Sequence, residues 1–89
     1  GVPQNYSEAL RWFYHAAEQG YAPAQHQVGS LVFQGKGTEQ NYLEGCKWWY
    51  IAADQDYPNA KEALTTVALT FLARDEMEHA SNLAREFKP

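Results

Sequence analysis

Residues 37–57 read GTEQNYLEGCKWWYIAADQDY, and residues 1–21 read GVPQNYSEALRWFYHAAEQGY, the same pattern 36 positions earlier. The two copies share a polar start and an end rich in aromatic residues and alanine. So many identities at one offset, with tryptophan and tyrosine among them, indicate an internal repeat of about 36 residues, and periods of this size are typical of solenoids. The identical pairs are Gly1 and Gly37, Gln4 and Gln40, Asn5 and Asn41, Tyr6 and Tyr42, Glu8 and Glu44, Trp12 and Trp48, Tyr14 and Tyr50, Ala16 and Ala52, Ala17 and Ala53, Gln19 and Gln55, Tyr21 and Tyr57, and Ala24 and Ala60.

The repeated stretch predicts a helix, which in the first copy covers residues 6–19. Asn5 can cap its start by accepting a hydrogen bond from a backbone N–H of the first turn, and Glu8 follows at the spacing of a capping box. Gly20 suits the left-handed conformation that ends helices, and Pro23 suits the first turn of the next one. In the second copy the corresponding positions hold Asn41, Glu44 and Asp56.

Two adjacent apolar stripes run along this helix, one through Trp12 and the other through Phe13. A helix that is apolar on two adjacent sides packs between two neighbours. Small residues let helix backbones approach closely, and large rings fill the remaining space. We therefore expect Trp12 and Trp48 to be wedged into the core. The stripes are Ala9, Trp12 and Ala16 with Leu10, Phe13 and Ala17 in the first copy, and Gly45, Trp48 and Ala52 with Cys46, Trp49 and Ala53 in the second.

The segment between the two copies predicts a second helix over residues 24–34, followed by a loop at residues 35–38. Gly29 lies inside this helix, where glycine costs about 1 kcal/mol relative to alanine. We infer that another helix or a tryptophan lies against the backbone at Gly29. The inward-facing residues of this helix are expected to be Ala24, Val28, Leu31 and Val32.

Taken together, these features resemble the Sel-1-like repeat family, whose units are relatives of tetratricopeptide repeats. The resemblance covers roughly residues 1–71. It departs from the family pattern at Val32 (usually tyrosine), Thr38 (often valine) and Asp56 (glycine), and none of these changes removes a core anchor. The residues that carry it are Ala24 to Leu31, Gly35 to Gly37, Asn41, Trp48, Ala52, Ala53 and Ala60, and in the partial copy Ala9, Trp12 and Ala16 to Gly20.

The resemblance implies an all-α fold, a right-handed α-α superhelix of helix–loop–helix repeats with a C-terminal capping helix. We expect residues 1–23 to be the second helix of a truncated repeat, 24–59 a complete repeat, 60–73 the first helix of the last repeat, and 74–89 the cap. The expected helices cover residues 6–19, 23–34, 42–55, 59–71 and 74–87. In the last helix one narrow apolar stripe with polar residues elsewhere is typical of a solenoid end.

The position of Gly1 in the repeat places it inside a loop, so the first helix, Tyr6 to Gln19, is expected to lack its partner. The face that carries Trp12 or Phe13 would then be exposed, and exposed apolar surface of that size promotes association. Self-association through this helix is therefore expected.

Composition argues against several functional classes. The chain has 89 residues, a net charge of −4 and one cysteine. An acidic surface repels phosphate, which argues against nucleic acid, and no apolar run approaches the length of a membrane span. We identify no catalytic residue and no cofactor site. We identify no metal site either, because His15, His26 and His79 lack partners at the spacing of a zinc site. The compartment stays open between a bacterial cytoplasm and the periplasm or exterior, because any leader sequence would precede Gly1.

The resemblance implies a protein-interaction scaffold that binds a protein or peptide partner. On the first helix of each pair, some side chains are not needed for packing. They are spaced four and then three residues apart along one face, where they define a possible groove. Phe33 stands out because it is large and its position is expected to be exposed, although packing on the loop between the helices is an equal alternative. The groove residues are His26, Ser30, Phe33, Glu62, Thr66 and Leu69.

The sequence has two alternative interpretations besides the scaffold. Some cysteine-rich members of the family have been described as β-lactamases, but this chain lacks their paired cysteines and any arrangement of nucleophile and base. A structural spacer or self-assembly segment is the other alternative, which the expected exposure of the first helix favours.

Overall fold

The structure is a computed structural model that describes residues 5–70 and 74–87. Five helices and no strand occur in these two ranges, which confirms the predicted all-α repeat fold, and the helix ends lie within two residues of those expected. The expected boundary at residue 73 and the first four residues of the repeated pattern lie outside the described ranges. The helices are α1 (Tyr6–Glu18), α2 (Ala22–Gln34), α3 (Tyr42–Ala53), α4 (Pro58–Thr70) and α5 (Arg74–Arg85).

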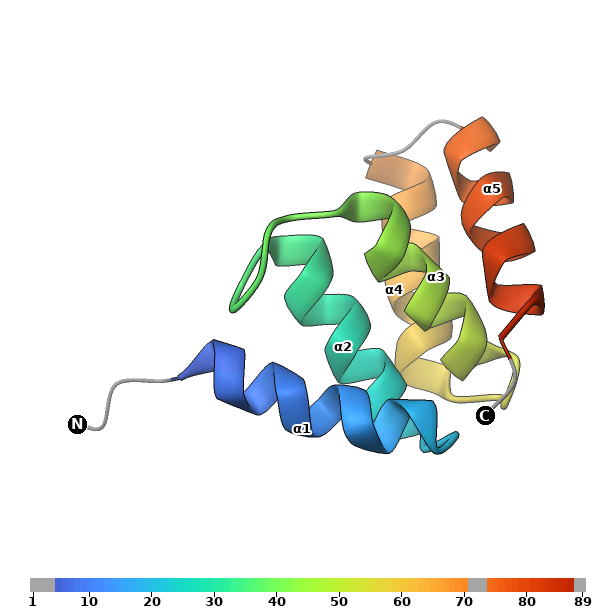
Figure 1. The fold of residues 1–89 in the computed structure, drawn as a ribbon. Helices are drawn as coiled ribbons and strands as arrows, with labels where there is room; N and C mark the ends of the chain where they lie inside the picture. The colour runs from blue at the N-terminus through green and yellow to red at the C-terminus, as the bar shows by residue number, and fades with distance from the viewer. Residues whose placement is uncertain (1–4, 71–73, 88–89) are drawn as a thin grey trace.

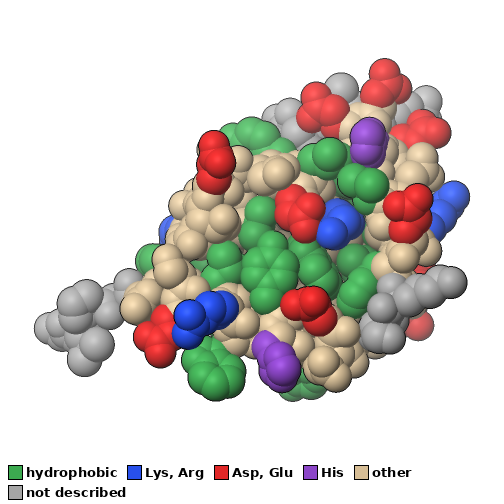
Figure 2. All heavy atoms as spheres, in the orientation of Figure 1, with side chains coloured by type: hydrophobic (Ala, Val, Ile, Leu, Met, Phe, Trp, Pro, Cys, Tyr) green, Lys and Arg blue, Asp and Glu red, His purple; other side chains and the backbone are tan. Residues whose placement is uncertain are grey.

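The helix α3 is the centre of the arrangement, because it packs against α2, α4 and α5 (Figure 1). The helix α4 lies behind α3 in this view, and α1 crosses the lower end of α2 at a large angle. One side of the molecule is therefore formed by α1, α3 and α5. Figure 2 shows that hydrophobic side chains gather in the middle of this side, with acidic side chains beside them.

The predicted helix caps are present in both copies of the repeat. Asn5 accepts a hydrogen bond from the backbone N–H of Glu8, and Asn41 accepts one from Glu44, each at 3.0 Å. Each cap satisfies one backbone donor that the first turn cannot satisfy within the helix. The polar starts of α1 and α3 are therefore repeated because each copy must begin a helix at the same point.

The turn after each of these helices uses the left-handed conformation. Gly20 follows α1 with a φ of 95°, and Asp56 follows α3 with a φ of 62°. Aspartate is one of the few residues other than glycine that adopts this conformation. Its carboxylate accepts a hydrogen bond from Nζ of Lys61 at 2.9 Å, and this contact lowers the pKa of Asp56. The departure at Asp56 therefore keeps the backbone geometry of the turn.

The closest helix approach lies between α2 and α3, at Gly29 and Gly45. A Cβ atom added at Gly29 would lie 2.6 Å from Cδ1 of Trp49 and 2.9 Å from the carbonyl oxygen of Gly45. A Cβ atom added at Gly45 would lie 2.8 Å from Cβ of Phe33. The expectation that a helix or a tryptophan lies against Gly29 is confirmed, because both a tryptophan ring and a helix backbone are there.

Two clusters of buried apolar side chains form the core, and α3 contributes to both. The helix α5 closes the first cluster with Met77 and Ala80, while Ala84 at its end and Phe87 after it pack against the second. The first cluster holds Phe33, Cys46, Trp49, Ala52, Ala60, Leu64, Val67, Met77 and Ala80. The second holds Leu10, Ala17, Ala24, Val28, Val32, Trp48 and Ile51.

A buried glutamine fastens the ends of three helices together. Gln25 on α2 is fully buried and donates a hydrogen bond to the carbonyl of Ala17 at 3.1 Å. The side-chain amide of Gln55, just after α3, donates to the side-chain oxygen of Gln25 at 3.0 Å and to the carbonyl of Gly20 at 2.9 Å. Because these groups are satisfied, the buried amide does not carry the cost of an unpaired polar group.

Trp12 and Trp48 hold equivalent positions in the repeat but have different surroundings. Trp48 is 4% exposed, whereas Trp12 is 68% exposed. The expectation that both rings are wedged into the core is therefore wrong for Trp12, and the expected exposure of the Trp12 face is confirmed. The physical reason is that Trp48 has Tyr14 of α1, the equivalent helix of the first copy, against it, and among the described residues no helix takes that place for Trp12.

Replacing Gly29 with alanine tests the α2–α3 approach. Alanine normally stabilises a helix interior by about 1 kcal/mol relative to glycine. Here the added methyl group meets a carbonyl oxygen that cannot move without separating the helices, and overpacking costs about 1–3 kcal/mol. The gain and the cost together leave an expected net loss of up to about 2 kcal/mol in the free energy of unfolding, measured by urea denaturation.

The matched control is Gln27→Ala, which changes an exposed residue of the same helix and should alter stability by no more than about 0.5 kcal/mol. A Gly29→Ala protein about 1 kcal/mol more stable than the parent, which is the gain expected for an uncrowded helix interior, would contradict the close approach.

Candidate protein-binding surfaces

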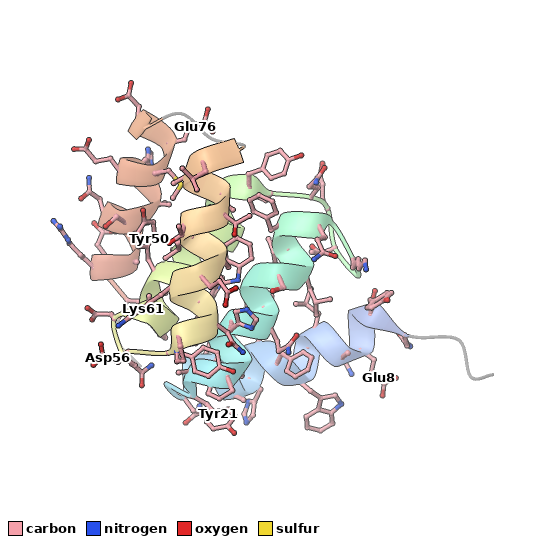
Figure 3. The ribbon with its side chains drawn as sticks, turned by 180° about the vertical axis from the view of Figure 1, so that it is seen from behind. Glu8, Tyr21, Tyr50, Asp56, Lys61 and Glu76 are labelled. Carbon is pink, nitrogen blue, oxygen red and sulfur yellow. The ribbon has the colours of Figure 1, made fainter. Side chains whose placement is uncertain are left out.

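The groove predicted from the sequence lies on the side formed by α2 and α4, which we call the α2–α4 face. Figure 3 views the molecule from behind, with α4 in front of α3 and α2 beside them. The face is defined by His26, Ser30 and Phe33 on α2 and by Glu62, Thr66 and Leu69 on α4. The six residues differ in exposure, so they do not contribute equally to the surface.

His26 has a structural position on this face. Its backbone carbonyl accepts a hydrogen bond from the Trp49 indole N–H at 3.2 Å, and its ring lies 5.6 Å from the Tyr57 ring. Its Nδ1 atom is buried, with no hydrogen-bond partner among the described residues. Burial lowers the pKa of His26 below its ordinary value of 6.5, so the ring is neutral at pH 7. It can therefore offer a partner shape and apolar contact but no positive charge.

Phe33 is not available to a partner, and the expectation that its position is exposed is wrong. It is 8% exposed and lies between the rings of Tyr42, at 4.7 Å, and Trp49, at 5.0 Å. The close approach of α3 at Gly45 draws Phe33 into the core. The alternative, in which Phe33 packs toward the segment that joins the two helices, is nearer to the structure. Its backbone carbonyl accepts a hydrogen bond from the Gln40 side chain in that segment.

The accessible part of the predicted groove is therefore mostly on α4. Glu62 and Thr66 are exposed, and Leu69 is 80% exposed. The Thr66 hydroxyl donates to the carbonyl of Glu62 at 3.1 Å, one turn earlier in the helix. Ser30 on α2 is half-buried. The α2–α4 face thus presents a large exposed leucine beside short polar groups.

A second surface, which the sequence did not predict, lies on the opposite side between α1, α3 and α5. It is a cleft of about 490 Å³, which we call the aromatic cleft, and Figure 2 shows this side of the molecule. Trp48 forms its base, with the Tyr14 ring edge-on at 5.7 Å and the Phe87 ring at 5.1 Å. The residues that line it are Tyr14, Glu18, Glu44, Lys47, Trp48, Leu83, Glu86 and Phe87.

Charged groups surround the rings of the aromatic cleft. Lys47 pairs with Glu44 at 2.9 Å, and its Nζ atom lies 5.0 Å from the centre of the Trp48 ring. The Trp48 indole N–H donates to the same Glu44 carboxylate at 3.2 Å. Burial raises the pKa of Tyr14, and the negative charges of Glu44 and Glu18 raise it further. Tyr14 therefore remains a neutral phenol at pH 7 in a negatively charged setting.

The described residues give no support to a metal site, a reactive cysteine or a membrane-spanning helix. No group of three or more His, Cys, Asp or Glu side chains in residues 5–70 and 74–87 could hold a metal ion. Cys46 is fully buried, and burial together with Glu76 raises the pKa of its thiol to about 11. The thiol is thus protonated at pH 7 and is a poor nucleophile or ligand. Among the described helices, none combines the length and the apolar character needed to cross a bilayer.

Comparison with known families agrees with the repeat seen in the sequence and the helices seen in the structure. The family model of the Sel1 repeat matches residues 1–21 and 22–57. The chain belongs to the Sel1 repeat family. Sel1 repeats generally mediate protein–protein interaction and are typically non-catalytic. No curated protein and no solved structure matches the chain.

The equivalent tryptophans of this Sel1 repeat protein provide a matched pair for testing burial. Truncating a large buried aromatic costs about 3–5 kcal/mol, and we expect this loss for Trp48→Ala. Trp12→Ala removes the same atoms from an exposed position and should cost less than about 1 kcal/mol. The free energies of unfolding would be measured side by side in urea. Equal losses for the two variants would contradict the structure.

Proposed function

We propose that this chain is a protein-interaction scaffold that acts without catalysis and binds its partner along the α2–α4 face. Membership of the Sel1 repeat family supports the general role. Leu69 is the observation that supports the surface, since it is a large apolar side chain, 80% exposed, that contact with a partner would remove from water. Thr66 and Glu62 lie about one and two turns earlier on the same helix, respectively, and supply polar contacts at its edge.

The absence of catalysis is part of the proposal. The hydrolase alternative relies on cysteine-rich relatives, and this chain has one cysteine, Cys46, which is buried. Penicillin turnover by the intact protein would support the hydrolase and contradict the scaffold. A structural or self-assembling role remains a second candidate, and it is supported by the exposure of Trp12 on α1.

Photo-crosslinking tests the α2–α4 face directly. A photoreactive phenylalanine analogue in place of Leu69 should crosslink the partner in cells that produce the intact protein, because the residue would lie inside the contact. The matched control carries the same analogue in place of Glu39, an exposed loop residue. A discrete crosslinked species is expected from position 69 and not from position 39. Equal crosslinking at both positions, or none at 69, would contradict the proposal.

Self-association through α1, the helix Tyr6–Glu18, can be tested separately. We expect the weight-average mass to rise with concentration in sedimentation equilibrium, because burying the exposed Trp12 ring removes apolar surface from water. Trp12→Ser should return the protein toward the monomer, and serine has a helix propensity close to that of tryptophan.

The control for self-association is Tyr21→Ser, which removes another exposed aromatic ring and should leave the mass unchanged. A parent protein that is strictly monomeric at all concentrations would disprove self-association.

A further inference from the structure

The aromatic cleft combines apolar walls with an excess of negative charge. Three carboxylates line it, those of Glu18, Glu44 and Glu86, against one ammonium group, that of Lys47. Glu44 is the one that pairs with Lys47. Glu18 and Glu86 are exposed, and among the described residues neither forms an ion pair. The cleft therefore has two carboxylates that are available to a positively charged group from outside.

In the aromatic cleft, the ammonium group of Lys47 is held between an aromatic ring and a carboxylate. Its Nζ atom lies 5.0 Å from the centre of the Trp48 ring and 2.9 Å from the Glu44 carboxylate. A cation within about 6 Å of an aromatic face is attracted by the negative charge of that face. Two further rings, Tyr14 and Phe87, line the same cleft together with the carboxylates of Glu18 and Glu86.

The walls of the cleft suit the stem of a long basic side chain. Leu83 and Phe87 are half-buried, so they offer apolar surface that is still reachable from solvent. Lysine and arginine place their methylene groups along such surface while the charged end stays near water or carboxylates. A cleft of about 490 Å³ has room for such a side chain and part of the backbone that carries it.

We propose that the aromatic cleft binds a lysine or arginine side chain presented by a basic segment of a partner protein. The partner is taken to be a protein because the chain belongs to an interaction family, and to this extent the inference rests on the proposed function. It concerns a different surface, however, since the aromatic cleft and the α2–α4 face lie on opposite sides of the molecule (Figures 2 and 3). The two proposals can therefore fail independently.

The test uses a fluorescein-labelled heptapeptide in which lysine alternates with glycine. Its binding to the intact protein is followed by fluorescence anisotropy at low salt, beside peptides in which arginine or glutamine replaces lysine. The lysine and arginine peptides should bind and the glutamine peptide should not. Glu18→Gln with Glu86→Gln should raise the dissociation constant about five- to tenfold, because two exposed ion pairs are lost.

A second double variant separates a specific site from general attraction to an acidic protein. Glu76→Gln with Glu78→Gln removes the same charge from exposed positions on α5 that do not line the cleft, and should change the dissociation constant by less than about twofold. Phe87→Leu keeps the charge but removes a ring, and it should weaken binding if its circular dichroism spectrum remains that of the parent.

NMR locates the bound peptide. The Trp48 indole N–H, which donates to Glu44 at the cleft, should shift on adding the lysine peptide. The indole N–H of Trp49, which donates to the His26 carbonyl in the core, should not. Equal weakening by both double variants, equal binding of the glutamine peptide, or an unmoved Trp48 resonance would each overturn the inference. Free spermidine competing as well as the lysine peptide would also overturn it, because a small polyamine would then be the ligand.

Discussion

The approach of α2 to α3 at Gly29 and Gly45 is the contact on which the other packing depends. Two glycines face each other there, so the helices come close enough for the Trp49 ring to lie against the Gly29 backbone and donate to the His26 carbonyl. A tryptophan in that place fills the space that two missing side chains leave. Phe33 packs on Trp49 from the α2 side. Because α3 is positioned in this way, its remaining sides can bind α4, α5 and the α1 ring Tyr14.

The repeated helix could be predicted because its residues both cap the helix locally and form the apolar faces that pack against neighbouring helices. Asn5 and Asn41 cap helices by local chemistry, and the apolar stripes follow from helical periodicity, so the sequence contains both signals. Gly29 could also be interpreted, since an interior glycine that weakens a helix needs a packing reason. The Gln25 and Gln55 network could not be predicted, because its hydrogen bonds join residues whose proximity depends on the finished fold.

The errors at Trp12 and Phe33 have one physical origin, which is that periodicity gives the face of a helix but not what covers that face. Trp12 shares its repeat position with the buried Trp48 but has no equivalent of Tyr14 against it among the described residues. Phe33 lies on the side of α2 assigned to a groove, but the missing side chain of Gly45 brings α3 close enough to cover it. A repeat register therefore predicts burial only where both neighbours of a helix are known.

The helix α5 was predicted from its narrow apolar stripe, but its part in forming the aromatic cleft was not. A helix that only closed the core would need Met77 and Ala80, which fill the first cluster. The turn that follows this helix brings the Phe87 ring to 5.1 Å from the ring of Trp48, which belongs to the second cluster. Because α5 and the turn after it cover both clusters, Glu86 lies at the same cleft as Glu18 of α1 and Glu44 of α3. The aromatic cleft and its excess of negative charge thus depend on the packing of α5 against α3, which the repeat pattern within residues 1–57 does not encode.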